Sequence, residues 1–229
     1  MDTAVVTGAS RGVGEVVTRA FADAGIHVVC CARSGDELDA VVDDILSDGG
    51  EATAVRADVR DEYDVERLME AAARIGDTID CVVANAGVYH GTTGETPLAA
   101  ESYSAFDDHL RTNTRGVFTT VKEAVPHLSE SARILVPSGE IAREPKAGLG
   151  GYAVSKAGAE AVARQYSAEL DAAVGVLDLG MLSTELTDHG PGRDPADVAG
   201  MFLWAAKAAD AETIDGAVVG LRDWKKATR

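Results

Sequence analysis

The sequence predicts an α/β fold: a single doubly wound parallel sheet with helices on both faces. Short apolar runs, rich in β-branched residues, alternate with longer amphipathic stretches along the whole chain. The runs are continuously apolar, which is typical of parallel strands covered on both sides. No repeat, low-complexity tract or linker interrupts the alternation, so residues 1–229 are expected to form one domain.

Each expected element follows from its own pattern. The expected strands are the apolar runs at Ala4–Thr7, Val28–Ala32, Ala52–Arg56, Cys81–Ala84, Ile134–Val136, Val174–Asp178 and Ala217–Gly220. The expected helices are the amphipathic stretches at Val13–Ala24, Asp36–Ser47, Asp61–Ile75, Ser102–Leu128, Tyr152–Leu170 and Pro195–Ala208. Gly25 and Gly49 are placed to end the first two helices, and Ser34 with Glu37 forms a capping-box pattern.

Charge excludes several classes of protein. The chain has 21 basic and 38 acidic residues, a net charge of −17, whereas phosphate-rich partners need a basic surface, so neither nucleic acid nor an anionic membrane is expected. No apolar run approaches the roughly 18 residues of a membrane span. The segment Met1–Val6 lacks the basic start and long apolar stretch of a secretion signal. These features predict a cytoplasmic protein.

The charged residues also show a bias in type. Only 6 of the basic residues are lysine, and Asp outnumbers Glu. High negative charge with few lysines resembles proteins that stay soluble in concentrated salt, where repulsion is screened over a few ångströms. An ordinary acidic cytosolic protein is the alternative.

The cysteines do not suggest a metal site or a disulfide. Cys30, Cys31 and Cys81 lie inside apolar runs without metal-ligand spacing. Adjacent Cys30 and Cys31 would point to opposite faces of a strand. We therefore expect structural thiols, and the scattered histidines give no reason to expect a bound metal.

A glycine-rich turn follows the first expected strand and opens a helix. Small residues there let the backbone approach a pyrophosphate, whose charge is stabilised by free N–H groups and the positive end of the helix. This position indicates a dinucleotide site, and a glycine-rich turn without a ligand is the alternative. The residues expected to bind the cofactor here are Gly8, Ser10, Arg11, Gly12, Val13 and Gly14.

The TGxxxGxG form of this turn resembles the short-chain dehydrogenase/reductase family in its single-domain branch. Three more motifs follow in the family's order along almost the entire chain. They are the NAG turn of Asn85, Ala86 and Gly87, the helix asparagine Asn113 with glycine three residues on, and the YxxxK pair Tyr152 and Lys156. The resemblance implies a Rossmann-like fold and an enzyme that acts on a carbonyl compound or an alcohol.

Tyr152 and Lys156 also make chemical sense together. Four residues apart, they share one face of a helix. A free phenol has a pKa of about 10. A nearby ammonium is expected to favour the phenolate and to bring the pKa of the phenol towards the pH at which the protein works. By resemblance, Tyr152 exchanges the proton at the substrate oxygen while nicotinamide exchanges hydride, Lys156 holds the cofactor ribose, and Asn113 anchors a water relay to Lys156.

Two departures from the family pattern concern the serine and the sixth-strand loop. The family's serine, which hydrogen-bonds the substrate oxygen, usually lies about thirteen residues before the tyrosine, where this chain has Gly139. Ser138 is the only Ser or Thr between 138 and Tyr152, so the serine role is assigned to it. After the sixth strand the proline of PGxVxT is missing. By resemblance the cofactor contacts there are Gly180, Leu182 and Thr184.

The end of the second expected strand indicates the cofactor. A carboxylate there would bind the 2′-hydroxyl of NAD, but Ala32 holds that place and Arg33 follows, with Ser34 next to it. Arg11 can approach the same phosphate, so NADP(H) is favoured over NAD(H). By resemblance, Asp58 and Val59 contact the adenine.

The substrate is not predicted beyond a small carbonyl or alcohol. A 3-oxoacyl-thioester reductase and a sugar dehydrogenase are alternatives within the family, and a catalytically impaired NAD(P)-binding regulator or scaffold is the alternative from another class. His90, Glu140, Arg143, Leu149 and His189 are candidates for the pocket wall. The resemblance implies a homo-oligomer, a dimer or tetramer formed through the helices at 102–128 and 152–170.

Overall fold

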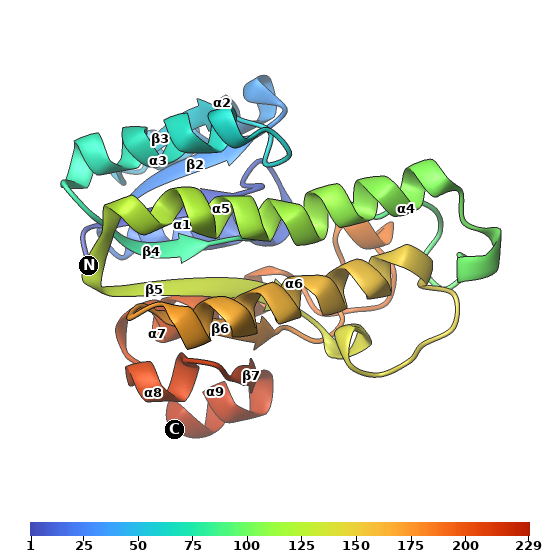
Figure 1. The fold of residues 1–229 in the computed structure, drawn as a ribbon. Coiled ribbons are helices and arrows are strands. Elements are labelled where there is room, and N and C mark those ends of the chain that lie inside the picture. The colour runs from blue at the N-terminus through green and yellow to red at the C-terminus, as the bar shows by residue number, and fades with distance from the viewer.

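A computed structural model describes residues 1–229, and it contains one parallel sheet of seven strands. The strand order is β3-β2-β1-β4-β5-β6-β7 (Figure 1). The strands are β1 Thr3–Thr7, β2 His27–Ala32, β3 Ala52–Arg56, β4 Ile79–Val83, β5 Leu128–Ser138, β6 Ala173–Asp178 and β7 Val218–Gly220. The α-helices are α1 Gly12–Asp23, α2 Gly35–Ser47, α3 Glu62–Gly76, α4 Tyr103–His109, α5 Gly116–Ala124, α6 Gly150–Glu169, α7 Ala196–Lys207, α8 Ala211–Ile214 and α9 Leu221–Ala227.

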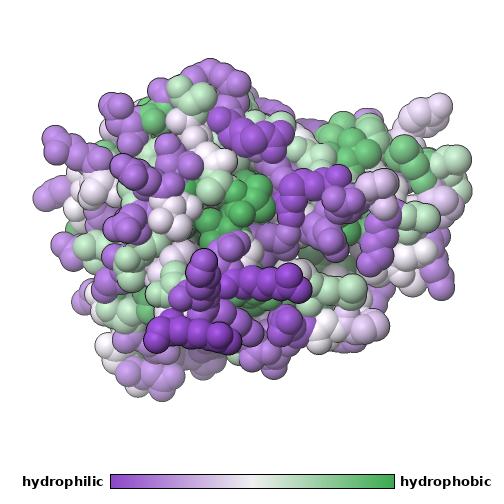
Figure 2. All heavy atoms as spheres, turned by 90° about the horizontal axis from the view of Figure 1, so that it is seen from below, coloured by the Kyte–Doolittle hydropathy of each residue, from purple (hydrophilic) through white to green (hydrophobic).

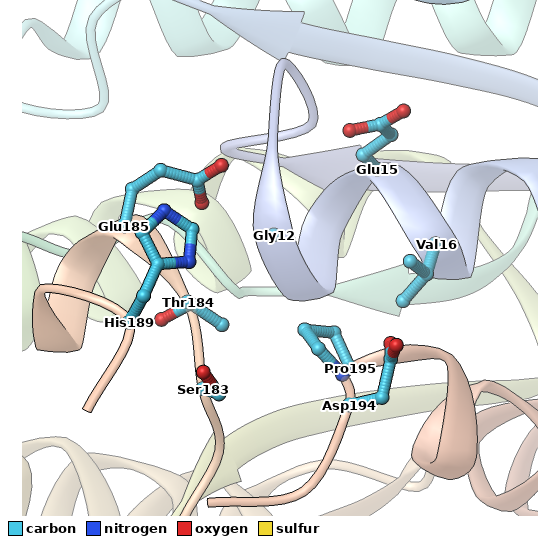
Figure 3. A pocket seen from close by; sticks show the side chains of 9 residues that line it. All are labelled: Gly12, Glu15, Val16, Ser183, Thr184, Glu185, His189, Asp194 and Pro195. Carbon is cyan, nitrogen blue, oxygen red and sulfur yellow. The ribbon is translucent and has the colours of Figure 1, made fainter. Parts of the chain in front are cut away.

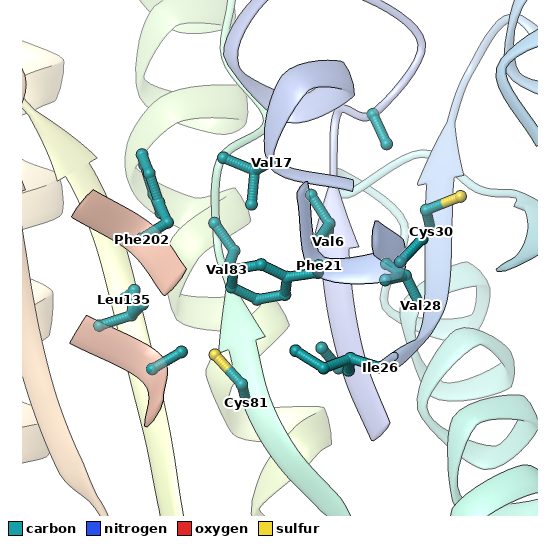
Figure 4. Close-up of a cluster of buried hydrophobic side chains, with 14 of the residues drawn as sticks. Val6, Val17, Phe21, Ile26, Val28, Cys30, Cys81, Val83, Leu135 and Phe202 are labelled. Atoms are coloured by element: carbon teal, nitrogen blue, oxygen red, sulfur yellow. The ribbon is translucent and has the colours of Figure 1, made fainter. Parts of the chain in front are cut away.

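The predicted fold class is confirmed, because helices cover both faces of the sheet. On one face α1, α2 and α7 pack over a core that includes Phe21 and Phe202 (Figure 4). On the other face α3, α5 and α6 pack over a second core. Cys30 belongs to the first core and Cys31 to the second, as expected for neighbours in a strand. All three cysteines are buried and free.

The point at which strand order reverses lies at β1. This strand pairs with β2 on one side and with β4 on the other, so the turns after β1 and β4 face one another. In parallel sheets such a crevice, beyond the carboxyl ends of the strands, is where ligands bind.

β5 is much longer than the predicted Ile134–Val136. It begins at Leu128 and reaches Ser138, because its polar, half-exposed start pairs with β4 across a register shift near Ile79. Pro137 fits inside the strand because β4 has already ended opposite Leu135, so no neighbour on that side needs its missing N–H.

The predicted helix Ser102–Leu128 is interrupted, which the amphipathic period did not reveal. Residues Leu110–Arg115 form a π-helical turn between α4 and α5. Such turns insert a residue into the helix and occur frequently at functional sites. The capping prediction for Ser34 is wrong in detail, since Ser34 stands at the N-cap of α2 without a side-chain hydrogen bond.

Polar side chains cover most of the surface. Seen from the end of the molecule where α8 and α9 lie, apolar residues appear only as separate patches among hydrophilic ones (Figure 2). No helix combines the length and the apolar composition that a membrane crossing requires.

Candidate active site

The glycine turn is a tight structure in which two of its glycines are required for different reasons. A Cβ on Gly14 would lie 2.1 Å from the carbonyl oxygen of Gly8, so α1 can pack on the turn only with glycine there. Gly12 has a φ of +58°, which favours glycine, and a Cβ on it would meet nothing closer than 3.7 Å. Its backbone faces a pocket of about 230 Å³ that also includes Thr184 (Figure 3).

Asn85 and Ala86 hold the glycine turn in place. The Asn85 side-chain amide donates to the carbonyl oxygens of Thr7, at 2.9 Å, and Gly8, at 3.2 Å. The backbone N–H groups of Asn85 and Ala86 both donate to Thr7 Oγ1 at 3.0 Å. The Asn85 side chain therefore joins the turns after β1 and β4, and its contact with the cofactor stays a prediction.

Asn113 joins the same loop to α6. Its Oδ1 accepts from the Val88 N–H at 2.8 Å, and its Nδ2 donates to Val88 O and to Ser155 Oγ, both at 2.9 Å. The π-helical turn places Asn113 at this junction, where it is buried. Ser155 in turn donates to the carbonyl oxygen of Tyr152 at 2.7 Å. Asn113 thus links the loop after β4 to the second turn of α6.

Tyr152 and Lys156 lie one turn apart on α6, as predicted, but their ionisation differs from the expectation. Burial, together with neighbouring Tyr89, raises the pKa of Tyr152 to about 12. Burial lowers the pKa of Lys156 to about 8, although the carboxylate of Glu160 acts in the opposite direction. Lys156 Nζ donates to the Pro137 carbonyl oxygen at 2.6 Å. The expected fall in the pKa of Tyr152 is therefore not seen here, because burial acts in the opposite direction.

Ser138, to which the serine role is assigned, has a buried carboxylate as its hydrogen-bond partner, and its catalytic role stays a prediction. Its hydroxyl donates to Glu160 Oε1 at 2.6 Å and makes no hydrogen bond to Tyr152. Side chains alternate along β5, and Ser138 shares the face of Val136, which packs against α6. Glu160 follows Lys156 by one helical turn and is 1% exposed. The geometry makes Ser138 the partner of a buried carboxylate.

Gly139 leaves space where the family's serine would stand. Its backbone is extended, with φ −156° and ψ 168°, so any residue can adopt it. A Cβ there would come no closer than 3.9 Å to another atom, the Gly180 carbonyl oxygen. The sequence spacing already pointed to position 139, and the structure shows that a side chain fits there.

The ends of β2 and β3 form a separate basic cavity. Its volume is about 440 Å³, and it is lined by Arg33, Arg56, Ala57, Asp58, Asp64 and Arg67. Arg33 and Asp58 were predicted to lie here, while Arg56 and Arg67 were missed because an arginine on a strand end or a helix face gives no distinctive sequence signal. Arg60 pairs with Asp58 through Nη2 and Oδ2 at 2.6 Å, which offsets the negative charge of that carboxylate. Val59 is buried and packs towards Gly116.

The loop after β6 lies opposite the glycine turn. Gly180 has a φ of +67°, Leu182 is buried in the core, and Thr184 begins the short 3₁₀ turn Glu185–Thr187. Of these predicted residues, Thr184 shares a pocket with Gly12 (Figure 3). The same pocket includes Glu15, Glu185 and Asp194, which sequence reasoning missed.

These features together are those expected of a dinucleotide-binding α/β protein, with a half-buried tyrosine and lysine on one helix. The family model for short chain dehydrogenases matches residues 2–191. The chain therefore belongs to the short-chain dehydrogenase/reductase family of oxidoreductases.

Individual relatives support the same membership. A versicolorin reductase of Emericella nidulans is 37% identical over 142 residues, which cover 61% of this chain and about half (52%) of that relative. An alcohol dehydrogenase from Thermococcus sibiricus, complexed with 5-hydroxy-NADP, is 27% identical, with a TM-score of 0.85 and 96% of each chain covered. A 3-ketoacyl-(acyl-carrier-protein) reductase from Brucella melitensis, complexed with NADH, is 26% identical, with the same TM-score and coverage.

The environment of Ser138 generates a first prediction. Ser138→Ala is expected to change kcat by less than about threefold but to destabilise the fold by about 1–3 kcal/mol, because a buried carboxylate loses a donor. Gly139→Ser is expected to raise kcat/KM, since it returns a hydroxyl to the family's position. Steady-state kinetics of both variants measure kcat and kcat/KM, and thermal unfolding measures their stability. Loss of turnover in Ser138→Ala with an unchanged melting temperature would instead support the catalytic assignment of Ser138.

The environment of Lys156 generates a second prediction. Because its ammonium is lost as pH rises through about 8, kcat/KM for the cofactor should fall over that range. Glu160 favours the charged lysine, so Glu160→Gln should move this fall to lower pH. The pH profile of both proteins, measured with the cofactor as the varied substrate, checks it. An unshifted profile in Glu160→Gln contradicts the coupling.

Proposed function

We propose that the protein is an NADP(H)-dependent oxidoreductase that interconverts a carbonyl compound and an alcohol by hydride transfer, with residues 1–229 as one catalytic unit. The observation that carries this proposal is the placement of Tyr152 and Lys156. They lie one turn apart on α6, and Lys156 reaches the carbonyl oxygen of Pro137 at the carboxyl end of β5. Tyr152 is the proposed general acid/base, Lys156 and Asn113 support it, and Ser138 acts on the site only through Glu160.

The chain's residues fit a dinucleotide. Gly12 presents open backbone at the start of α1, where N–H groups and the helix dipole favour a pyrophosphate. When bound, the nicotinamide supplies or accepts the hydride. The high pKa keeps the Tyr152 phenol protonated at neutral pH, which suits a group that donates a proton to a carbonyl oxygen during reduction. The proposed role of Lys156, taken from the resemblance to the family, is to hold the cofactor ribose.

NADP(H) is preferred over NAD(H) in this proposal. Arg33, Arg56 and Arg67 line one cavity at the end of β2 and β3, where the 2′-phosphate of NADP is expected. Guanidinium groups suit phosphate oxygens because they donate in pairs. The two carboxylates in the cavity are the counterargument, and Arg60 offsets the charge of Asp58. The relatives themselves include complexes with 5-hydroxy-NADP and with NADH.

Two alternatives have specific support. A 3-oxoacyl-thioester reductase is favoured by the similarity to the Brucella melitensis reductase. A catalytically impaired NAD(P)-binding regulator or scaffold is favoured by Gly139 and by the bond between Ser138 and Glu160. Intact Tyr152 and Lys156 favour the enzyme. Oxidation of NADPH with a panel of ketones, aldehydes and β-ketoacyl thioesters separates these possibilities.

We further propose a cytoplasmic homo-oligomer, a dimer or tetramer, with α4, α5 and α6 in its interface. Phe118 on α5 is 44% exposed and stacks on Tyr166 of α6, and Val154 is 41% exposed. Exposed apolar side chains on adjacent helices suit a subunit contact. The net charge of −17 suits solubility in concentrated salt.

The first test of this proposal is Tyr152→Phe. Because the variant keeps the ring but lacks the acidic proton, kcat for NADPH-dependent reduction should fall by at least about 100-fold. NADPH binding, measured by fluorescence titration, should change little. Tyr63→Phe, on an exposed position of α3, is the control. Undiminished turnover in Tyr152→Phe would refute the assigned role.

The second test concerns cofactor preference. Arg33→Asp replaces a guanidinium by a carboxylate that can accept from a 2′-hydroxyl, so the ratio of kcat/KM for NADPH to that for NADH should fall by about 10–100-fold. Arg56→Ala should lower the same ratio by a smaller factor. Arg74→Ala, on a distant exposed face of α3, is the control. A wild-type enzyme that already prefers NADH would overturn the NADP assignment.

A further inference from the structure

Beside Tyr152 lies a buried acid–imidazole pair that the mechanism above does not use. His109 ends α4 and is 0% exposed, and the side chain of Glu101, just before α4, is 2% exposed. His109 Nδ1 and Glu101 Oε1 lie 2.9 Å apart. Their approach is off the axis of a good hydrogen bond, yet neither atom has another polar partner. Buried polar atoms of this kind are costly unless they are paired, so each depends on the other.

The second ring nitrogen defines the tautomer of His109. The backbone N–H of His90 donates to His109 Nε2 at 3.0 Å, so Nε2 must be unprotonated. The proton of the neutral ring therefore sits on Nδ1, facing the carboxylate of Glu101. In this form the imidazole connects Glu101 to the backbone of the loop after β4.

The second carboxylate oxygen reaches the helix that bears the catalytic tyrosine. Glu101 Oε2 accepts the backbone N–H of Gly151, the residue before Tyr152. A Cβ on Gly150 would lie 2.5 Å from Oε2, and one on Gly151 would lie 2.9 Å from both oxygens. The two glycines leave the space that this carboxylate occupies. Glu101 is thus built into the N-terminus of α6.

The imidazole also supports the aromatic side chains around Tyr152. The His109 ring stacks on Tyr89, with centroids 5.9 Å apart and an angle of 22° between planes. Tyr89 meets Tyr152 edge-on at 4.9 Å, and the His109 centroid lies 6.1 Å from that of Tyr152. The Tyr89 hydroxyl donates to Thr92 O at 3.1 Å, which fixes its far end. His109 therefore packs against Tyr89, and Tyr89 packs against the phenol ring of Tyr152.

We propose that Glu101 and neutral His109 are positioning residues for Tyr152. Glu101 fixes the start of α6, and His109 fixes the Tyr89–His90 segment against the phenol. The inference rests on the proposed function, because it takes Tyr152 as the proton donor. Neither residue needs to touch substrate or cofactor, and the pair acts on catalysis by orientation of the phenol.

Protonation of His109 would break this arrangement. A hydrogen on Nε2 would face the His90 N–H, so the bond between them would be lost. Burial lowers the pKa of His109, and neighbouring His90 acts in the same direction, while Glu101 and Asp108 oppose it. Asp108 is itself paired with His90 and Arg60. The neutral form therefore persists to lower pH than in a free histidine, and the arrangement is lost as pH falls through that lowered pKa.

The experiment compares variants that keep or remove the hydrogen-bonding groups. His109→Gln has an amide that can accept from His90 and donate to Glu101 but does not ionise. His109→Leu and Glu101→Ala remove the groups, and Glu101→Gln removes the charge. His127→Gln and Glu66→Gln, both away from the site, are the matched controls. We measure kcat, KM, NADPH affinity and melting temperature for each variant, and the pH profile of kcat for wild type and His109→Gln.

His109→Leu and Glu101→Ala should lower kcat by about 10–100-fold, the loss typical of a displaced catalytic group, while NADPH affinity stays within about twofold. His109→Gln should recover most of kcat and lose the acid limb of the wild-type profile. Wild-type kcat in folded His109→Leu and Glu101→Ala, or equal falls in kcat and NADPH affinity, would overturn the inference.

A measurement without turnover separates this inference from the proposed function. ¹⁵N NMR of the histidine side chains should show His109 with a protonated Nδ1 and an unprotonated Nε2, assigned by its absence in His109→Gln. Glu101→Gln should shift the Nδ1 resonance. A protonated Nε2 at neutral pH overturns the inference even in an active enzyme. If the wild type is inactive but His109 has the expected tautomer, the proposed activity is refuted. The positioning role is then refuted as well, because there is no proton donation for Glu101 and His109 to support.

Discussion

The site depends on one constraint: α6 buries polar side chains against the carboxyl ends of β5 and β6, and each buried polar group needs a partner. Ser155 is paired by Asn113, Lys156 by the carbonyl oxygen of Pro137, and Glu160 by Ser138. These pairings come from two separate segments of the chain, the π-helical turn that holds Asn113 and the end of β5 that holds Pro137 and Ser138. They orient α6 about its own axis, and this orientation determines where the phenol of Tyr152 lies.

Glu160 extends this constraint to the loop after β5. Arg143 binds Glu160 with one nitrogen of its guanidinium and Asp178 with another. A buried carboxylate bound by an arginine that bridges it to a second carboxylate is strongly coupled to its surroundings, since removal of one partner leaves an uncompensated charge. Arg143, expected as a possible pocket residue, instead ties the loop to α6 and β6. The Ser138 hydroxyl donates to the same carboxylate.

The distribution of charge is uneven over the molecule. The chain carries a net charge of −17, yet Arg33, Arg56 and Arg67 line one cavity at the end of β2 and β3. Local cations can attract a phosphate within an acidic protein because screening in salt limits the reach of distant charges to about 8–10 Å. The net charge of the chain thus affects its solubility, whereas the arginines of the cavity determine whether a phosphate can bind there.

Sequence alone determined the alternation of strands and helices, the glycine turn and the spacing of Tyr152 and Lys156, because these depend on local periodicity and on neighbours within one helical turn. Only the tertiary structure decided which buried groups pair. The bond from Ser138 to Glu160 and the bond from Gly151 to Glu101 join segments that lie far apart in the chain, and the π-helical turn interrupts a helix that the amphipathic pattern shows as continuous. Burial, which sets the pKa of Tyr152 above its ordinary value, arises in the same way. Desolvation and long-range pairing are properties of the assembled layers, so no run of residues specifies them by itself.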